Sequence, residues 1–462
     1  MATTAPLPIV TDSELSAPGI QAGPSASEPL TVSATLAAGE ALDARRQRGE
    51  RVLPMAFGEA GVPAAPILRY ALAAASHQNG YGPVAGAKAL REAAAGYWRR
   101  RGLPTSPDDV VCGPGSKALL YGLLLSLGSS VDVAIPRPSW VSYAAQASLT
   151  GVRSVHVPVT AGLGGVPAAG GVPDPERLSA AADAALADGR RIGAVIVTLP
   201  DNPTGTLAGP EVVRALCEVA RRYDMLIISD EIYRDLAFEG PAAVTSPASL
   251  APERTIVTSG LSKNLALGGW RLGVARLPVA SPALASLRAA LLATGSEIWS
   301  APAAPVQQAA ALAFEELPEI TERMKASRRL HGRIVREVAS RFAAAGALVA
   351  PPAGAFYLYP DFGPHRAVLA GRYGVRTGTD LADLLLDRYG IGVLPGSAFG
   401  DEDEALRMRV ATSRLYGDTP SRQEAALASP NPAALPWIAS SLNWISDSLA
   451  ELVSPGGRPP WN

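Results

Sequence analysis

The chain has 462 residues, of which 48% are hydrophobic and 18% are charged, and its formal net charge is −1. This length and composition predict a globular protein of two or three domains with a sizeable core, and they exclude a disordered chain. The balanced charge argues against a general nucleic-acid or anionic-membrane surface, because such surfaces need an excess of cations.

The cysteine content and the composition of individual segments bear on metal sites, membrane spans and cellular location. Cys112 and Cys217 are too few for a disulfide framework or a zinc cluster, and their apolar surroundings favour packing, so we expect no metal site. No run approaches the roughly 18 apolar residues of a membrane span. The first basic residue is Arg45, which leaves no basic region for a secretory or transit peptide, so we expect a cytoplasmic protein.

The predicted elements begin after an aperiodic tail. Residues 1–32 are rich in Ala, Pro, Ser and Thr, which predicts disorder. Helical spacing and a basic C-terminal end predict a helix at 34–48, followed by a short strand at 52–57. Two more helices are expected at 66–77 and 86–101, on either side of the turn Q-N-G-Y-G-P.

From residue 109 onward, short apolar runs alternate with helical segments. Strands are predicted at 110–112, 131–135, 194–199, 225–229 and 255–258, and helices at 117–127 and 210–223. Uninterrupted apolar strands that alternate with helices imply an α/β fold with a mainly parallel sheet covered on both faces. The Gly- and Ala-rich stretch 162–172 is expected to form a flexible surface loop.

A different pattern from about residue 320 predicts a second, smaller α+β domain. It comprises helices at 322–345, 379–389 and 437–452, strands at 347–350, 355–359, 392–394 and 408–411, and a polar connection at 413–436. The predicted organisation is therefore a tail (1–32), an N-terminal segment that joins the small domain (33–61), a large domain (62–325) and a small domain (326–462).

The stretch Thr258–Gly273, T-S-G-L-S-K-N-L-A-L-G-G-W-R-L-G, carries the sharpest chemical signal. Lys263 sits on a turn of small residues after an apolar strand, and Arg271 follows eight positions later. A partly desolvated lysine amine can form a Schiff base, and an arginine offers a planar, permanently charged fork for phosphate. On this stretch alone, a surface turn with two ordinary basic residues remains the alternative.

Further polar residues follow the predicted strands, where open parallel sheets bind ligands. Gly115 and Ser116 open a helix whose backbone N–H groups form an anion site, unless they serve only as a helix cap. Asp230 ends an uncharged strand, so its buried carboxylate needs a partner, either a protonated ring nitrogen or a structural cap. Tyr233 lies three residues on, within reach of a phenolate oxygen on the same ring.

Two further side chains complete this edge of the sheet. Trp140 offers a flat face for stacking, although a lone aromatic residue more often belongs to a core. Asn202 lies in the turn N-P-T-G, and its amide could donate to a ring oxygen. Because all these residues follow strands, a shared binding site is favoured over unrelated turns and caps.

Taken together, these stretches resemble the class I/II aminotransferases of the aspartate aminotransferase family, which are fold-type I pyridoxal 5′-phosphate enzymes. The P-S-W-V-S-Y and G-L-S-K forms look most like a bacterial branch that includes aspartate and prephenate aminotransferases. The resemblance covers the chain from about residue 33 and rests on the motifs Y-G-P-V-A-G-A-K-A-L-R (81–91), G-P-G-S-K-A-L (113–119), P-S-W-V-S-Y (138–143), D-N-P-T-G (201–205), S-D-E-I-Y (229–233), S-K-N-L-A-L-G-G-W-R-L-G (262–273), G-A-F-Y-L (354–358), P-G-S-A-F-G (395–400) and R-M-R-V-A-T-S (407–413).

This resemblance implies a fold, an activity and partners. The large domain would hold a mainly parallel seven-stranded sheet between helices. The enzyme would move an amino group between an L-amino acid and a 2-oxo acid in ping-pong half-reactions, in amino-acid metabolism or biosynthesis. Family sites are shared across a homodimer, so Tyr81 would reach the phosphate of the neighbouring subunit.

The family's residue roles carry over onto the matching positions. Lys263 would hold pyridoxal 5′-phosphate as an internal aldimine and then act as acid–base for the proton shift. Asp230 would keep the pyridine nitrogen protonated, which strengthens the ring as an electron sink. Arg407 would clamp the substrate α-carboxylate with a bidentate pair. The other expected contacts are Tyr233 and Asn202 at the ring hydroxyl oxygen, Trp140 stacked on the ring, Gly115, Ser116, Lys117 and Arg271 around the phosphate, Ser262 as a further cofactor contact, and Gly58, Trp140 and Asn202 beside the substrate.

Three departures from the family pattern lie where substrate choice is made. Gly260 stands where many relatives have serine, Pro63 comes later after Gly58 than usual, and Arg409 replaces a small residue. These departures would suit an unusual substrate, so β-elimination, cyclisation or oxidation of an amino acid with the same cofactor remains the alternative function.

Two questions stay open in the sequence. The first is the substrate side chain, for which the candidates to bind a distal charge are Arg137, Lys117, Glu297 and Arg409. The second is whether the chain is a regulatory protein that kept this fold without its enzymatic activity. This alternative is disfavoured because residues 1–30 contain no Lys or Arg and are too short for a basic DNA-binding domain.

Overall fold

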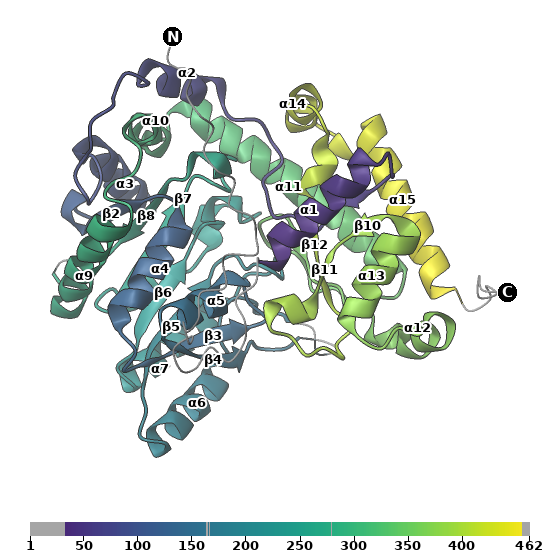
Figure 1. The fold of residues 1–462 in the computed structure, drawn as a ribbon, viewed down its shortest axis with the longest axis horizontal. Coiled ribbons are helices and arrows are strands. Elements are labelled where there is room, and N and C mark those ends of the chain that lie inside the picture. The colour runs from purple at the N-terminus through teal and green to yellow at the C-terminus, as the bar shows by residue number, and fades with distance from the viewer. Residues whose placement is uncertain (1–32, 163–164, 166, 279, 455–462) are drawn as a thin grey trace, which may run out of the picture. The chain divides into compact units, whose positions relative to one another are not determined.

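A seven-stranded sheet is the central feature of the computed structural model, which describes residues 33–162, 165, 167–278 and 280–454. The predicted tail at 1–32 lies outside these residues. The strands, in spatial order, are β2 (Val110–Gly113), β8 (Gly273–Arg276), β7 (Thr255–Gly260), β6 (Leu226–Asp230), β5 (Ile192–Thr198), β3 (Asp132–Arg137) and β4 (Arg153–Pro158). Only β8 runs antiparallel to its neighbours, so the predicted α/β fold with a mainly parallel seven-stranded sheet is confirmed (Figure 1).

Apolar side chains of the sheet point alternately to its two faces, and helices cover both. Along β5, Ala194 and Ile196 pack on one face while Val195 and Val197 pack on the other. The first face is covered by α4 (Ser116–Leu127), α5 (Ser142–Leu149) and α9 (Pro282–Ile298). The second face is covered by α6 (Pro175–Ala187), α7 (Pro210–Arg222) and α8 (Pro247–Leu250), and near β2 and β8 by α2 (Pro66–Ala74), α3 (Lys88–Arg100) and α10 (Ala304–Glu315).

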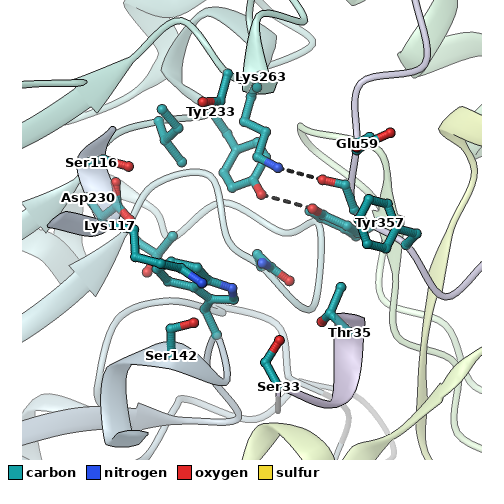
Figure 2. Close-up of a pocket in the computed structure, with 18 of the residues that line it drawn as sticks. Ser33, Thr35, Glu59, Ser116, Lys117, Ser142, Asp230, Tyr233, Lys263 and Tyr357 are labelled. Atoms are coloured by element: carbon teal, nitrogen blue, oxygen red, sulfur yellow. Dashed lines mark hydrogen bonds between the residues drawn. The ribbon is translucent and has the colours of Figure 1, made fainter. Parts of the chain in front are cut away.

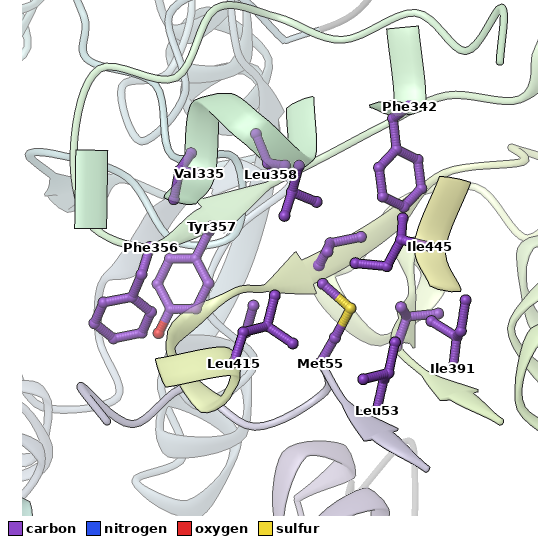
Figure 3. Close-up of a cluster of buried hydrophobic side chains, with 14 of the residues drawn as sticks. Leu53, Met55, Val335, Phe342, Phe356, Tyr357, Leu358, Ile391, Leu415 and Ile445 are labelled. Carbon is purple, nitrogen blue, oxygen red and sulfur yellow. The ribbon is translucent and has the colours of Figure 1, made fainter. Parts of the chain in front are cut away.

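The C-terminal part of the chain has a core of its own, to which α11 (Pro318–Ala344) contributes Val335 and Phe342 (Figure 3). Its antiparallel sheet has the order β11-β12-β9. The strands are β9 (Tyr357–Leu358), β11 (Leu394–Pro395) and β12 (Met408–Ala411), and the helices are α12 (Arg366–Tyr373), α13 (Gly378–Tyr389), α14 (Pro420–Ala428) and α15 (Pro436–Val453). The strand expected at 347–350 is reduced to one bridge between Leu348 and Asp361, and α14 lies within the expected connection 413–436.

The N-terminal segment packs with this C-terminal part. Strand β1 (Leu53–Pro54) pairs in parallel with β10 (Ile391–Gly392), and both Leu53 and Met55 lie in the core drawn in Figure 3. The purple helix α1 (Ala34–Gln47) lies among the green and yellow C-terminal elements in Figure 1. This packing carries residues 57–59 from the end of β1 into the space between the C-terminal sheet and β7, where the candidate site lies.

The prediction of a surface loop at 162–172 is wrong for the C-terminal end of this stretch, because residues 169–172 are buried. The backbone N–H of Gly170 donates to Thr206 Oγ1 at 2.9 Å. A Cβ on Gly170 would lie 2.1 Å from Thr204 Oγ1, so the glycine lets the backbone dock onto the 201–206 turn. Among the helices of the described residues, none is long and apolar enough to cross a membrane.

Candidate active site

The polar residues that follow the strands gather around one cavity of about 410 Å³. Figure 2 shows Lys263, Tyr233 and Tyr357 on one side of it and Ser116, Lys117 and Asp230 on another. The predicted site residues that line the cavity are Gly58, Ser116, Lys117, Trp140, Asn202, Asp230, Tyr233, Ser262, Lys263 and Arg271. Three predicted residues, Gly115, Tyr81 and Arg407, are not among its lining residues.

Lys263 follows β7 on a turn that brings its amine to the N-terminal segment. Its Nζ donates to the backbone oxygen of Gly58 at 2.5 Å. Burial, together with the nearby Arg409 guanidinium, lowers the pKa of Lys263 to about 8 against the opposing effect of Glu59. About a tenth of this amine is therefore unprotonated and nucleophilic at pH 7, far more than for a lysine of ordinary pKa.

Asp230 ends β6 with its carboxylate buried at the carboxyl edge of the sheet. Tyr143 Oη donates to its Oδ2 at 2.9 Å and Thr258 Oγ1 donates to its Oδ1 at 3.2 Å. Burial raises the pKa of Asp230 to about 6 although both donors oppose the rise. A cationic partner in the cavity would compensate this burial, as a protonated ring nitrogen would.

Tyr143 is a site residue that the sequence analysis missed, although it stands in the quoted P-S-W-V-S-Y motif. It lies three positions after Trp140, and their rings meet edge to face with centroids 5.2 Å apart. The same hydroxyl lies 2.8 Å from Thr198 Oγ1. Tyr143 therefore joins the ends of β5 and β6 beneath the cavity.

The turn from β2 into α4 forms a cradle with Arg271. Gly115 has a φ of +93°, and a Cβ there would lie 2.4 Å from Arg271 Nη2. Arg271 itself has a left-handed φ of +53°, and its Nη1 donates to the backbone oxygen of Gly268 at 2.8 Å. The guanidinium thus lies directly beside the N-terminus of α4, whose free backbone N–H groups begin at Ser116. Together they suit a phosphate dianion.

Lys117 and Trp140 lie next to this cradle. The Nζ of Lys117 sits 4.9 Å from the centroid of the Trp140 ring. Partial burial lowers the pKa of Lys117, and the Arg271 charge adds to this effect. Among the described residues, burial and Arg271 account for this shift and no carboxylate contributes to it, so the charge of Lys117 is available to a ligand.

Arg409, and not the predicted Arg407, lies in the cavity. Its side chain is 1% exposed, its Nη1 donates to Asn202 Oδ1 at 3.0 Å, and its Nη2 donates to the backbone oxygen of Ala56 at 2.6 Å. The Nε of Arg409 is buried without a hydrogen-bond partner among the described residues. This arginine therefore retains donor capacity that a carboxylate in the cavity could use.

Arg407 is turned away because two acidic side chains hold its guanidinium. Its Nε donates to Asp361 Oδ2 at 2.8 Å, and its Nη1 lies 3.2 Å from Asp401 Oδ2. Tyr359 Oη donates to the same Asp401 carboxylate at 3.1 Å. The structure therefore does not bring Arg407 to the site where the sequence analysis expected a substrate clamp.

Tyr81 also lies outside the cavity, and 97% of its surface is exposed. Its expected contact is with a neighbouring subunit, so this contact stays a prediction. Other lining residues were not expected from the sequence, namely Ser33, Thr35 and Leu36 at the start of α1, Phe57, Glu59, Ser142 and Tyr357. The motif G-A-F-Y-L was the only signal for Tyr357, and the early residues of α1 lie in no quoted motif.

The cavity fits the pyridoxal 5′-phosphate that the resemblance implied. It offers a lysine amine of lowered pKa, a buried carboxylate that is in no ion pair among the described residues, and an arginine beside a helix N-terminus. These three groups match an aldehyde, a ring nitrogen and a phosphate, respectively.

Comparisons with known proteins agree with this fit. The family "Aminotransferase class I and II" matches residues 55–415. The aspartate/prephenate aminotransferase of Thermus thermophilus is 32% identical, over 84% of this chain and 93% of that protein. The arginine–pyruvate transaminase of Pseudomonas aeruginosa is 33% identical, over 77% of this chain and 84% of that protein.

The solved structures point the same way. The structure of aspartate aminotransferase from Thermus thermophilus with maleate superposes with a TM-score of 0.73 at 28% identity, and the match covers 86% of this chain and 96% of that one. The chain therefore belongs to the class I and II aminotransferases, fold-type I enzymes that use pyridoxal 5′-phosphate to transfer amino groups.

Proposed function

We propose that this aminotransferase takes the amino group of an acidic L-amino acid, such as aspartate or glutamate, and passes it to a 2-oxo acid. The observation that carries this proposal is the convergence of Lys263, Asp230, Arg271 and Arg409 on one cavity, with Lys117 as an additional cation. An acidic donor is also supported by the relative from Thermus thermophilus, which is named for aspartate and prephenate.

Besides Lys263, four side chains and the N-terminus of α4 would hold the cofactor. Arg271 and the N-terminal amides of α4 would bind its phosphate, and Asp230 would face its ring nitrogen. Because Asn202 Oδ1 accepts from Arg409, its amide Nδ2 is left to donate to the ring oxygen, next to the hydroxyl of Tyr233. When bound, pyridoxal phosphate supplies an aldehyde that amines condense with and a ring that withdraws electrons.

Lys263 would both anchor the cofactor and move the proton. Its lowered pKa keeps the amine available for condensation near neutral pH. Once a substrate amine replaces it, Nζ would accept the proton from the substrate α-carbon and deliver it to the carbon that was the cofactor's aldehyde. Gly58, whose backbone oxygen lies 2.5 Å from Nζ, would hold this amine beside the reacting atoms.

Arg409 is proposed as the clamp for the substrate α-carboxylate. Asn202 and Ala56 orient its guanidinium, and Phe399 and Tyr357 lie against it with ring centroids 4.8 and 5.0 Å from its Cζ. A planar guanidinium fixed in this way suits bidentate binding of a carboxylate.

Lys117 is proposed to bind the distal carboxylate of the donor. We test this by measuring steady-state kinetics with aspartate, glutamate, alanine, arginine and phenylalanine as donors and 2-oxoglutarate or oxaloacetate as acceptor. The substitution Lys117→Gln should raise KM for aspartate about 10-fold or more, as loss of a charged hydrogen bond does, and leave KM for alanine unchanged. A wild-type preference for arginine or phenylalanine would contradict the acidic donor. A weaker cofactor affinity in Lys117→Gln, with KM unchanged, would place Lys117 at the phosphate instead.

We also propose a cytoplasmic homodimer with shared sites and the two-domain organisation expected from the sequence. Exposed aromatic side chains support an interface, since Tyr70 is 75% exposed and Tyr81 is 97% exposed. Sedimentation velocity of the cofactor-loaded protein should give a dimer, and a monomer at micromolar concentration would contradict shared sites.

A further inference from the structure

Tyr357 reaches the cavity from the C-terminal part of the chain. It lies on β9, where its backbone pairs with Ala411 of β12, and 1% of its surface is exposed. Its hydroxyl lies 2.9 Å from the hydroxyl of Tyr233, and Figure 2 shows this hydrogen bond below Lys263. Tyr357 stands in the G-A-F-Y-L motif, but none of the roles proposed above accounts for this second phenol.

Two glycines and one arginine fix the position of Tyr357. A Cβ on Gly58 would lie 2.4 Å from the Tyr357 hydroxyl, and a Cβ on Gly205 would lie 2.1 Å from its backbone oxygen. The Arg409 Cζ lies 5.0 Å from the centroid of its ring. Gly58, Gly205 and Arg409, which are far apart in the sequence, thus all pack against Tyr357. Its hydroxyl has Tyr233 Oη as its hydrogen-bond partner.

The same arginine decides which phenol donates. Burial raises the pKa of both hydroxyls, and the Arg409 guanidinium opposes the rise at each of them. Its ring-facing contact is with Tyr357, so it makes Tyr357 the stronger acid and the better donor of the two. Tyr357 then donates to the Tyr233 oxygen, and the Tyr233 proton is free to point into the cavity.

We infer that Tyr357 is a positioning residue that acts through Tyr233, because its hydroxyl donates to Tyr233 and orients the Tyr233 proton toward the ring oxygen of the cofactor. A phenol that accepts one hydrogen bond is a stronger donor in the next, so the ring oxygen receives a stronger hydrogen bond. This inference rests on the proposed function, in which Tyr233 contacts that ring oxygen.

The test is a pH titration of the visible absorbance of the cofactor-loaded enzyme without substrate. Hydrogen bonds to the ring oxygen favour the deprotonated, anionic form of the bound cofactor. Tyr357→Phe keeps the ring and removes only the donor, so the midpoint of the titration should rise by about half a pH unit, since one neutral hydrogen bond is lost. A midpoint equal to that of the wild type would overturn the inference and leave Tyr357 as a packing residue.

A matched control and a double variant distinguish a positioning role of Tyr357 from a role in packing alone. Tyr359→Phe removes a neighbouring buried hydroxyl that binds Asp401 outside the cavity, and its midpoint should stay at the wild-type value. Tyr233→Phe should raise the midpoint more than Tyr357→Phe does, and the double variant should equal Tyr233→Phe alone, because Tyr357 acts through Tyr233.

Each remaining outcome has a defined meaning. An additive shift in the double variant, or a shift in Tyr359→Phe as large as in Tyr357→Phe, would contradict the inference. A wild-type protein without a titrating visible band would contradict the proposed function instead, so the two failures are distinguishable.

Discussion

Burial moves the pKa values of Lys263 and Asp230 in opposite directions, toward about 8 and about 6 respectively. The cavity disfavours the charged form of both side chains, and the bound cofactor would offset the free-energy cost of burying them. Lysine condenses with an aldehyde in its neutral form, whereas aspartate regains its charge opposite a protonated ring nitrogen. The cavity is thus prepared for one particular set of partner groups.

The lowered pKa of Lys263 predicts how fast the enzyme takes up its cofactor. Only the neutral amine attacks the aldehyde, so the capture rate of the cofactor-free enzyme should rise with pH through a midpoint near 8. Stopped-flow absorbance measures this rate, and N-acetyl-lysine amide serves as the control, with a midpoint near about 10.4. A rate that rises only near the control's midpoint would contradict a buried, neutral amine.

Because Arg409 and not Arg407 lies in the cavity, the same substitution by lysine should have a large effect at Arg409 and a small effect at Arg407. Arg409→Lys should raise KM for the amino donor about 30-fold, because a bidentate guanidinium pair becomes a single contact. Arg407→Lys should change KM less than threefold, since Arg407 pairs with Asp361 and Asp401 outside the cavity. Steady-state kinetics of the two variants decide between them, and the reverse pattern would restore Arg407 as the clamp.

At the scale of elements, the turn between β2 and α4 shows how one glycine admits an arginine. Gly115 has a positive φ and no side chain, so the Arg271 guanidinium lies against its Cα next to the helix N-terminus. Gly128 ends the same helix with a φ of +75°, but nothing lies within 4 Å of where its Cβ would be. The two glycines therefore share a positive φ that other residues rarely adopt, and they differ in what they contact.

This difference predicts distinct outcomes for two alanine substitutions. Gly115→Ala should weaken cofactor binding about 10-fold or more, because the new Cβ displaces a charged phosphate ligand. Gly128→Ala should lower stability through backbone strain alone and leave cofactor affinity unchanged. Fluorescence titration with pyridoxal phosphate measures both affinities, and equal losses in the two variants would contradict the cradle.

The elements also show what the sequence could and could not predict. Five of the seven strands of the sheet, with the residues after them, were predicted because a buried strand is a continuous apolar run and its carboxyl end binds ligands, whereas β4 and β8 were not predicted. Arg407 and Arg409 lie two positions apart, so their side chains share one face of the same chain segment. Asp361 and Asp401 hold Arg407 outside the cavity, whereas Asn202 and the backbone oxygen of Ala56 hold Arg409 inside it. The local pattern does not encode these contacts.

Composition misled at residues 162–172 for a related reason. Gly and Ala predict an exposed, mobile loop, yet Gly170 and Gly171 are buried because their lack of side chains admits the 198–206 backbone. Tyr143 and Tyr357 were missed because their roles arise from contacts with Asp230 and Tyr233, each far away in sequence.

For the whole of residues 33–454, the C-terminal core depends on segments from both ends of this range. Leu53 and Met55 pack with α11 and α15, and the backbone N–H of Ala411 donates to Met55 O at 2.7 Å. His331 of α11 is buried in the same region, where its Nδ1 lies 2.6 Å from Tyr416 Oη and its Nε2 lies 3.1 Å from Ser327 Oγ. Burial lowers the pKa of His331 to about 3.

This buried histidine predicts an acid-sensitive fold. The folded-state pKa lies below the unfolded value of about 6.5, so the unfolded chain binds more protons, and stability is lost as pH falls from about 6.5 toward 3. Between pH 7 and pH 5 the loss from this group is at most about 2 kcal/mol. Urea unfolding at both pH values should show a smaller loss for His331→Gln than for the wild type. The exposed control His77→Gln should match the wild type, and an unchanged loss in His331→Gln would contradict the account.

The most direct test of transamination at this site is one half-reaction, followed by its reversal. The cofactor-loaded enzyme is mixed with aspartate or glutamate without an acceptor, the visible spectrum is recorded, and the 2-oxo acid is quantified. We predict that the visible band is lost as the cofactor converts to its amine form and that about one 2-oxo acid appears per active site. Adding 2-oxoglutarate should then restore the band. Lys263→Ala should show neither the loss nor the recovery. A band that stays unchanged with every donor, or an altered band that no 2-oxo acid restores, would contradict transamination at this site.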